Sequence, residues 1–191
     1  EGRTCGNTLT TGSYNCFLGH NANVNANNLE NAVAIGYNSL AQASNTMYLG
    51  KSGVSYYNYG AWNNLSDSRD KLDIQDTNLG LTFINKLKPR MYIEDHRSAY
   101  LEEGQSFPLD GNIVKDGSKK GTRYHQGLVA QEVKVVMDEL GVDFSGYNDQ
   151  GICGGPNSLY IKYTELITPL IKAVQELSAR LVIAEAQIAV L

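Results

Sequence analysis

Short apolar clusters, each followed by a glycine, recur along the first third of the chain. Residues 7–19 and 38–50 align without a gap at an offset of 31, and residues 31–36 repeat their ending. We predict three short strands that end at Gly19, Gly36 and Gly50. Equivalent positions spaced by 14–17 residues indicate stacked rungs, with glycine at corners of positive φ and asparagine in the turns.

Each predicted rung offers one large apolar residue, namely Leu18, Ile35 and Leu49. One chain would bury little with them, so we expect three chains to meet at these positions and form a thin core around an axis. The pattern resembles the repeats of trimeric viral fibres and bacterial adhesins. Short strands rich in asparagine and glycine also occur in single-chain β-helices, and this alternative stays open.

The apolar pattern takes a helical period later in the chain. Residues 80–89 predict an amphipathic helix ended by Pro89, and residues 91–93 predict a strand. Apolar positions 129, 133, 136, 137 and 140 predict a second helix, ended by Gly141 before a glycine-rich loop at 146–155. We therefore expect an α+β chain: a trimeric β-rich stalk with triple β-helix-like rungs at 1–65, followed by a mixed α/β domain at 66–191.

The C-terminal residues 165–191 predict one long coiled-coil helix, because apolar residues there follow a heptad. The a and d positions are Ile167, Leu170, Val174, Leu177, Leu181, Ala184, Ile188 and Leu191. Thr168 is the expected N-cap, and Pro169 is tolerated in a first turn. Branched residues at a with leucine at d favour dimers in isolated coils, but the three-chain stalk favours a trimer. The alternative is a long helix packed within a monomeric core.

Charge separates the two predicted parts. Residues 1–65 contain four charged side chains, whereas the rest of the chain carries the net charge of −4. The chain has no basic stripe for nucleic acid and no apolar run near the ~20 residues needed for membrane insertion. Cys5, Cys16 and Cys153 lack metal-ligand spacing, so we expect free thiols, no metal site and no cofactor. The chain begins at Glu1 without a methionine, and we expect it to be part of a longer protein.

Four motifs follow one another from residue 66 onward. They are Ser66-Asp-x-Arg-x-Lys71, Leu87-Lys-Pro89, His125-x-Gly-x-x-Ala-Gln-Glu132 and Tyr163-x-Glu-Leu-Ile-x-Pro-Leu-Ile-Lys172. In this order they resemble the endosialidase-type C-terminal intramolecular chaperone, a self-cleaving serine peptidase family of phage tail spikes, tail fibres and neck appendages. The resemblance covers about residues 64–180. It departs from the family at Gln126, where many members have tyrosine, and in a long loop at 98–121.

The resemblance implies a Ser–Lys dyad that cuts the bond between Leu65 and Ser66 once. Ser66 is then the nucleophile and Lys71 its general base. A serine hydroxyl needs a neighbour that takes its proton, and a lysine can do so only as the neutral amine. Apolar surroundings or a cation such as Arg69 favour that form, whereas a nearby Asp67 or Asp70 opposes it. We therefore expect at least one of these carboxylates to point away or to pair with Arg69.

The same resemblance implies a function in virus assembly. It describes a homotrimeric chaperone whose folding client is its own N-terminal stalk, in a tail fibre or spike of a virion, with the chaperone domain released in the host cytoplasm. His125 is a candidate for orienting the cleavage site, although a histidine before a helix is more often a structural residue.

A different class of function is a non-cleaving adhesive fibre tip. It would bind a host-surface glycan through the aromatic residues at 56–62. A glycan-degrading spike is disfavoured, because such enzymes need paired carboxylates and residues 1–65 contain only Glu1 and Glu30.

Overall fold

The structure, a computed structural model, describes residues 2–51, 54–102, 108, 110–150 and 157–190. The chain divides into two compact units. The first comprises Glu1–Tyr56, Met91–His125 and Asp149–Leu159, and the second comprises Tyr57–Arg90, Gln126–Asn148 and Tyr160–Leu191. Each unit is thus built from separated segments of sequence, and the domain boundary at residue 65 stays a prediction.

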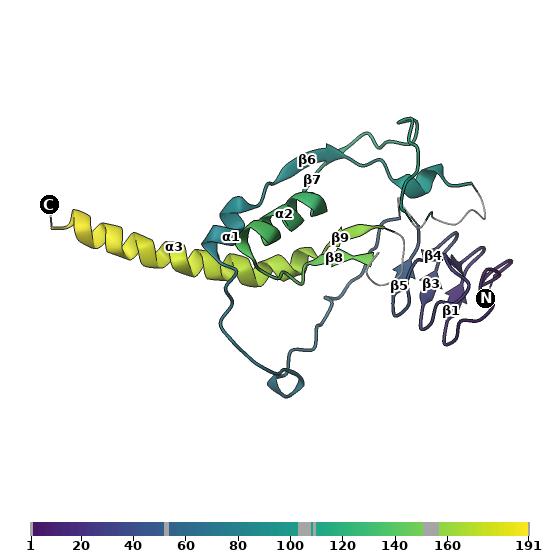
Figure 1. Cartoon of the computed structure of the whole chain (residues 1–191), viewed down its shortest axis with the longest axis horizontal. Helices are drawn as coiled ribbons and strands as arrows, with labels where there is room; N and C mark the ends of the chain where they lie inside the picture. Colours follow the sequence, from purple (N-terminus) through teal and green to yellow (C-terminus); the bar gives the residue numbers. More distant parts are fainter. Residues whose placement is uncertain (1, 52–53, 103–107, 109, 151–156, 191) are drawn as a thin grey trace. The chain divides into compact units, whose positions relative to one another are not determined.

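The first unit begins with stacked rungs. Strands β1 (Cys16–Leu18), β3 (Val33–Ile35) and β5 (Met47–Leu49) form one parallel sheet in that order (Figure 1). Strands β2 (Asn23–Val24) and β4 (Leu40–Ala41) pair in parallel as a second sheet. The three predicted strands are therefore confirmed, and each ends immediately before its glycine.

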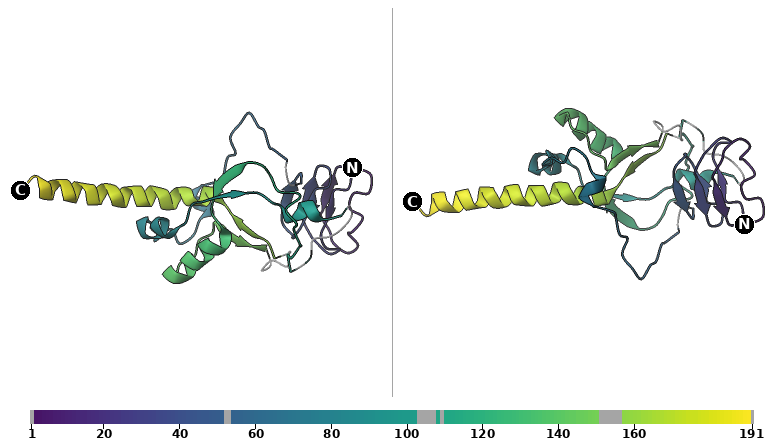
Figure 2. Two further views of the ribbon diagram at one scale, coloured as in Figure 1. Left: turned by 90° about the horizontal axis from the view of Figure 1, so that it is seen from above. Right: turned by 90° about the horizontal axis from the view of Figure 1, so that it is seen from below.

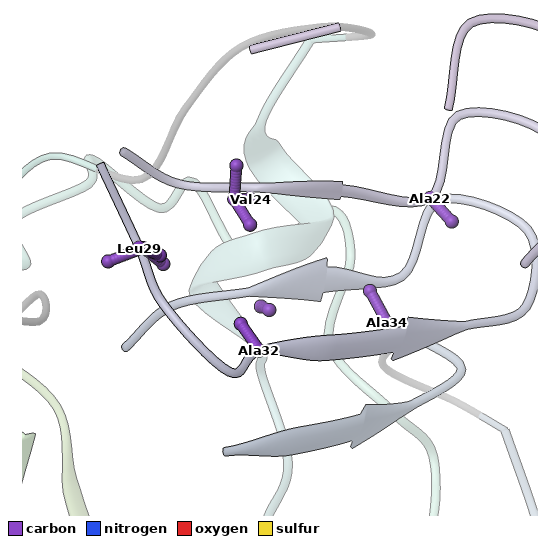
Figure 3. Packing of buried hydrophobic residues seen from close by; sticks show 6 residues of the cluster. Ala22, Val24, Leu29, Ala32 and Ala34 are labelled. Atoms are coloured by element: carbon purple, nitrogen blue, oxygen red, sulfur yellow. The ribbon is translucent and has the colours of Figure 1, made fainter. Parts of the chain in front are cut away.

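The rungs of one chain have a hydrophobic core of their own. Its side chains are mostly small (Figure 3): Ala22, Val24, Leu29, Ala32, Ala34 and Ala41. All of these are fully buried except Leu29, which is 7% exposed. Alternate residues of a strand face opposite sides, so the larger Leu18 faces away from this core and is 50% exposed. The expected core between chains at Leu18, Ile35 and Leu49 stays a prediction, and alanine and valine fill a separate, narrow space within one chain.

The corners of the rungs follow the sequence prediction. Gly19 and Gly36 have φ of 129° and 112°, and a Cβ on Gly19 would lie 2.7 Å from the carbonyl oxygen of Gly36. Only glycine allows this backbone angle together with so close an approach. The next corner carries Asn21 and Asn38 in left-handed conformation, with an amide-to-amide hydrogen bond of 3.0 Å between their side chains.

Two short sheets follow in the later part of the chain. Strand β6 (Arg90–Ile93), which the sequence predicts, pairs with β7 (Tyr124–Gly127), and β8 (Tyr147–Asp149) pairs with β9 (Leu159–Ile161). The sequence analysis did not predict β7, β8 or β9. The first half of the predicted glycine-rich loop at 146–155 contains β8, and residues 151–155, Cys153 among them, lie outside the described residues.

The second unit has a mixed core of helices and loops. Helix α1 (Leu81–Lys86) and helix α2 (Ala130–Leu140) contribute Phe83, Val133 and Met137, which pack with Phe144. The rings of Phe83 and Phe144 lie 5.2 Å apart at 55°. Gly141 ends α2 in left-handed conformation, which confirms the predicted stop.

The long C-terminal helix is present as predicted and is continuous in both views of Figure 2. Helix α3 (Ile167–Ile188) is preceded directly by a 3₁₀ helix, η4 (Tyr163–Leu166). Leu166 is consequently the N-cap, and the prediction of Thr168 in that position is wrong because helical backbone already begins before it. Pro169 lies in the first turn, where it is buried. Leu191 lies outside the described residues.

Candidate active site

The predicted dyad lies on a short, exposed helical turn. The turn interrupts the extended segment between β5 and α1 (Figure 1), as the 3₁₀ helix η1 (Ser68–Asp70) with Asp67 as its N-cap. The backbone N–H of Asp70 donates to the Asp67 carbonyl, and the N–H of Lys71 donates to the Ser68 carbonyl, both at 3.2 Å. A turn of this kind reverses the chain within a few residues and returns Lys71 to Ser66.

The two dyad side chains are in direct contact. Lys71 Nζ lies 2.7 Å from Ser66 Oγ and 3.0 Å from the carbonyl oxygen of Ser66. In this arrangement the ammonium group donates to both oxygens. The predicted nucleophile and its predicted base are therefore within hydrogen-bond distance, which is the geometry that serine activation needs. Both side chains are exposed, as are the flanking Leu65 and Leu72, at 82% and 89%.

Asp67 pairs with Arg69 and is not bonded to Lys71. Its Oδ1 accepts from the backbone N–H of Arg69 at 2.9 Å and from Nε at 3.0 Å, and Oδ2 accepts from Nη2 at 2.6 Å. The hydrogen bonds from Arg69 hold the pKa of the Asp67 carboxyl below its usual value, and the same pair raises the pKa of Arg69. The expectation that one carboxylate pairs with Arg69 is confirmed.

His125 is not part of this turn. It lies in β7, in the first unit, where its ring stacks on Tyr92 with centroids 6.4 Å apart. This contact agrees with the structural role that is more common for such a histidine. Its part in orienting the cleavage site stays a prediction.

The later motifs contain structural residues that the sequence analysis did not single out. Arg90 forms a two-pronged ion pair with Glu132, with Nε 2.9 Å from Oε2. The pair raises the pKa of Arg90 and lowers that of Glu132. The hydroxyl of Tyr163 accepts the backbone N–H of Leu128 at 2.8 Å. Glu132 and Tyr163 both belong to the sequence motifs, which marked these two residues but not their partners.

Glu176 links α3 to the N-terminus of α1. Its Oε2 accepts the backbone N–H of Leu81 at 2.8 Å, and Gly80, the N-cap of α1, offers no side chain for this purpose. A Cβ on Gly80 would lie 2.5 Å from Oε1 of Glu176. No local pattern predicts this contact, because 95 residues separate its partners in sequence.

The predicted seam of α3 is exposed along its length. The exposed fractions range from 46% at Leu170 to 69% at Ile188, and Ala184 is also exposed. The residues of α3 that are buried in its own unit, Pro169 and Ala173, lie on a different face. Within one chain the described part of the heptad, from Ile167 to Ile188, therefore has no apolar cover.

Metal ligation and membrane insertion find no support in the described part of the chain. Its histidines, cysteines and carboxylates form no group of three or more that is suited to a metal ion. None of its helices combines the length and apolar character that a membrane span requires.

Comparison with known proteins gives a family match for the central part of the chain. Residues 66–142 match the family model Peptidase_S74, chaperone of endosialidase. The match begins at Ser66 and includes the turn, α1 and α2, whereas the rungs and α3 lie outside it. A search of curated proteins gave no match. Residues 66–142 are thus similar to the endosialidase-type chaperone family, in agreement with the resemblance that the motifs indicate.

Proposed function

We propose that the chain is an intramolecular chaperone that gathers three copies of itself, guides the folding of its own N-terminal stalk and then cuts the Leu65–Ser66 bond. The family implies a chaperone for fibre folding. The observation that carries the cutting step is the 2.7 Å contact between Ser66 Oγ and Lys71 Nζ, at the first residues of the family match.

The proposed reaction uses Ser66 against its own preceding carbonyl. Lys71, as the neutral amine, takes the hydroxyl proton while Oγ attacks the carbonyl carbon of Leu65 through a five-membered ring. The peptide C–N bond breaks, the amine of Ser66 takes the proton from Lys71, and an ester links Leu65 to Oγ. Water then hydrolyses the ester and leaves a carboxylate on Leu65 and a new N-terminus at Ser66.

Assembly is the proposed trigger of this reaction. In one chain Ser66 and Lys71 are in contact, but both side chains are exposed to water. The neighbouring Leu65, Leu72 and Ile74 are also exposed, at 82%, 89% and 70%. We propose that the other copies cover these apolar residues, exclude water from the dyad and so favour the neutral amine.

The trimer is proposed to form through the exposed heptad of α3. Its seam residues are apolar at every a and d position, and those up to Ile188, which the structure describes, lack cover within one chain. A coiled coil is built from local contacts and forms quickly, so it holds three chains together before the slower stalk folds.

The rungs offer a second surface to the trimer. On the outer side of the first sheet, Leu18, Ile35 and Leu49 stand in register, and so do Cys16, Val33 and Met47. Met47 and Leu18 are 63% and 50% exposed. These two apolar ladders support the proposal that the stalks of three copies pack against one another, in addition to the core that each has.

The cut then makes the stalk kinetically stable. Once the chaperone part has left, the stalk cannot unfold by the route along which it was assembled. We propose that the stalk remains in the tail fibre or spike of a virion and that the chaperone part is released in the host cytoplasm.

A second candidate function rests on an exposed aromatic group before the cleavage site. Tyr56, Tyr57, Tyr59 and Trp62 are 62% to 114% exposed. Aromatic faces of this kind bind sugar rings, so an adhesive tip for a host-surface glycan remains the alternative, without any cutting. Glycan binding by the intact chain with one uncut species would favour it.

The intact mass of the purified chain tests the proposal. Wild type should give two fragments, with the new N-terminus at Ser66, whereas Ser66→Ala should give the single 20.9 kDa chain. Ser68→Ala is the matched control, because it removes a hydroxyl from the same turn, and it should be cut like wild type. Cutting of Ser66→Ala, or a wild-type chain that stays whole, would refute the dyad.

A further inference from the structure

We infer that Asp67 is the positioning residue of the cleavage site, whose carboxylate holds the turn that brings Lys71 to Ser66. The inference rests on the proposed function and extends it to a group that takes no part in proton transfer. Asp67 is in extended conformation, with φ −68° and ψ 138°, and its side chain caps the first N–H of the helical turn that follows.

The dyad depends on this turn because nothing else described holds it. The turn has no buried residue, and its backbone hydrogen bonds are both at the outer limit of normal length, 3.2 Å. The bond from the Arg69 N–H to Asp67 Oδ1 is shorter, at 2.9 Å. A short 3₁₀ turn without tertiary packing forms only weakly, so its cap has a large share in deciding how often Lys71 and Ser66 meet.

The ion pair between Asp67 and Arg69 contributes less to the geometry of the turn than the capping hydrogen bond does. Both partners are at the surface, with 87% of the Arg69 side chain exposed, and exposed ion pairs contribute little. The capping bond, in contrast, goes to the backbone of Arg69. It therefore persists in Arg69→Ala, which separates the two effects within one turn.

Cleavage kinetics of the full chain test the inference. Chains synthesised in a cell-free pulse and chased should be cut about fivefold more slowly in Asp67→Ala, the effect expected from the loss of an N-cap acceptor. Asp67→Asn keeps the acceptor without the charge and should stay within about twofold of wild type, as should Arg69→Ala. Asp70→Ala is the matched control, since it removes a carboxylate from the same turn but leaves the cap.

Any of three outcomes would overturn the inference. These are cleavage of Asp67→Ala at the wild-type rate, cleavage of Asp67→Asn as slow as that of Asp67→Ala, and equally slow cleavage of Asp70→Ala. The second outcome would mean that the charge of the Asp67 carboxylate takes part in the reaction. The third would indicate a general effect of charge near the cleavage site.

A structural readout keeps this test separate from the fate of the self-cleavage proposal. In full-length Ser66→Ala, NMR cross-peaks between the methyl group introduced at position 66 and the Lys71 ε-methylene report the turn without any cutting. We expect these cross-peaks to weaken severalfold when Asp67→Ala is added, and to persist with Asp67→Asn. Unchanged cross-peaks in Asp67→Ala would refute the positioning role whether or not wild type is cut.

Discussion

Among single residues, Lys71 has the most specific task in the proposed reaction. A general base must be able to exist as the neutral amine, so that it can accept a proton. An arginine in place of Lys71 would keep the positive charge and the long side chain, but it stays protonated in proteins. We expect Lys71→Arg to be as uncut as Lys71→Ala on denaturing gels. Lys119→Arg, in the exposed loop of the first unit, is the control and should be cut normally. If Lys71→Arg retained cleavage, Lys71 would act only through its charge.

Gly19 is the residue on which the stacking of the rungs depends most clearly. Its φ of 129° and the 2.7 Å approach of a Cβ to the Gly36 carbonyl both exclude a side chain. We expect Gly19→Ala to destabilise the stalk by about 1–3 kcal/mol, the usual cost of such backbone strain. Thermal unfolding measures this, with Gly60→Ala as the control, since a Cβ there meets nothing within 4 Å. Equal melting temperatures for the two variants would contradict this account of the corner.

At the scale of elements, the contact between α1 and α3 depends on Glu176. Without its carboxylate, the half-buried N–H of Leu81 loses its acceptor, so Glu176→Ala should lower the free energy of unfolding by about 1–2 kcal/mol. Glu185→Ala, on the exposed C-terminal part of α3, should change it by less than about 0.5 kcal/mol. Urea unfolding of the uncut Ser66→Ala chain distinguishes the two, and equal losses would contradict this role of Glu176.

The seam of α3 can be tested by placing the same negative charge on two different faces of the helix. Leu181→Asp, at an a position, should weaken assembly roughly thirtyfold or more, because a central interface residue contributes about 2 kcal/mol or more. Ala179→Asp lies at an exposed position outside the seam and should assemble like wild type. Sedimentation velocity measures both variants. Assembly that is unaffected by Leu181→Asp would exclude the heptad as the interface.

Elements with a strong local signal could be predicted from the sequence. The strands that end before Gly19, Gly36 and Gly50, the stop of α2 at Gly141 and the extent of α3 all follow from periodicity and from glycine at fixed positions. The face of the rungs that forms the core could not be predicted from the sequence. Large side chains such as Leu18 suggest a core, but the core within one chain is built mainly from small side chains such as Ala34.

The candidate site was predictable to a similar, limited extent. Ser66 and Lys71 follow from a motif, and the structure brings them together because only five positions separate them. The partners of Glu176 and Tyr163, namely Leu81 and Leu128, could not be predicted from the sequence, although Tyr163 itself belongs to a motif. The two links join segments that are 95 and 35 residues apart, and such contacts arise from the packing of the whole unit.

For the whole molecule, the account requires three copies. One chain gives the dyad its geometry and the rungs a small core, but it leaves the heptad of α3, the apolar ladders of the rungs and the surroundings of the dyad exposed. Exposed apolar surface of this extent is typical of an interaction site. The proposed trimer would account for all three surfaces, and we therefore connect folding, trimerisation and cleavage.

Native mass spectrometry of the full-length Ser66→Ala chain tests this central claim most directly, because the uncut chain keeps both the stalk and the coil. The account predicts one dominant species with three times the mass of the 20.9 kDa chain at low micromolar concentration. A folded species with the mass of a single chain under the same conditions would contradict it.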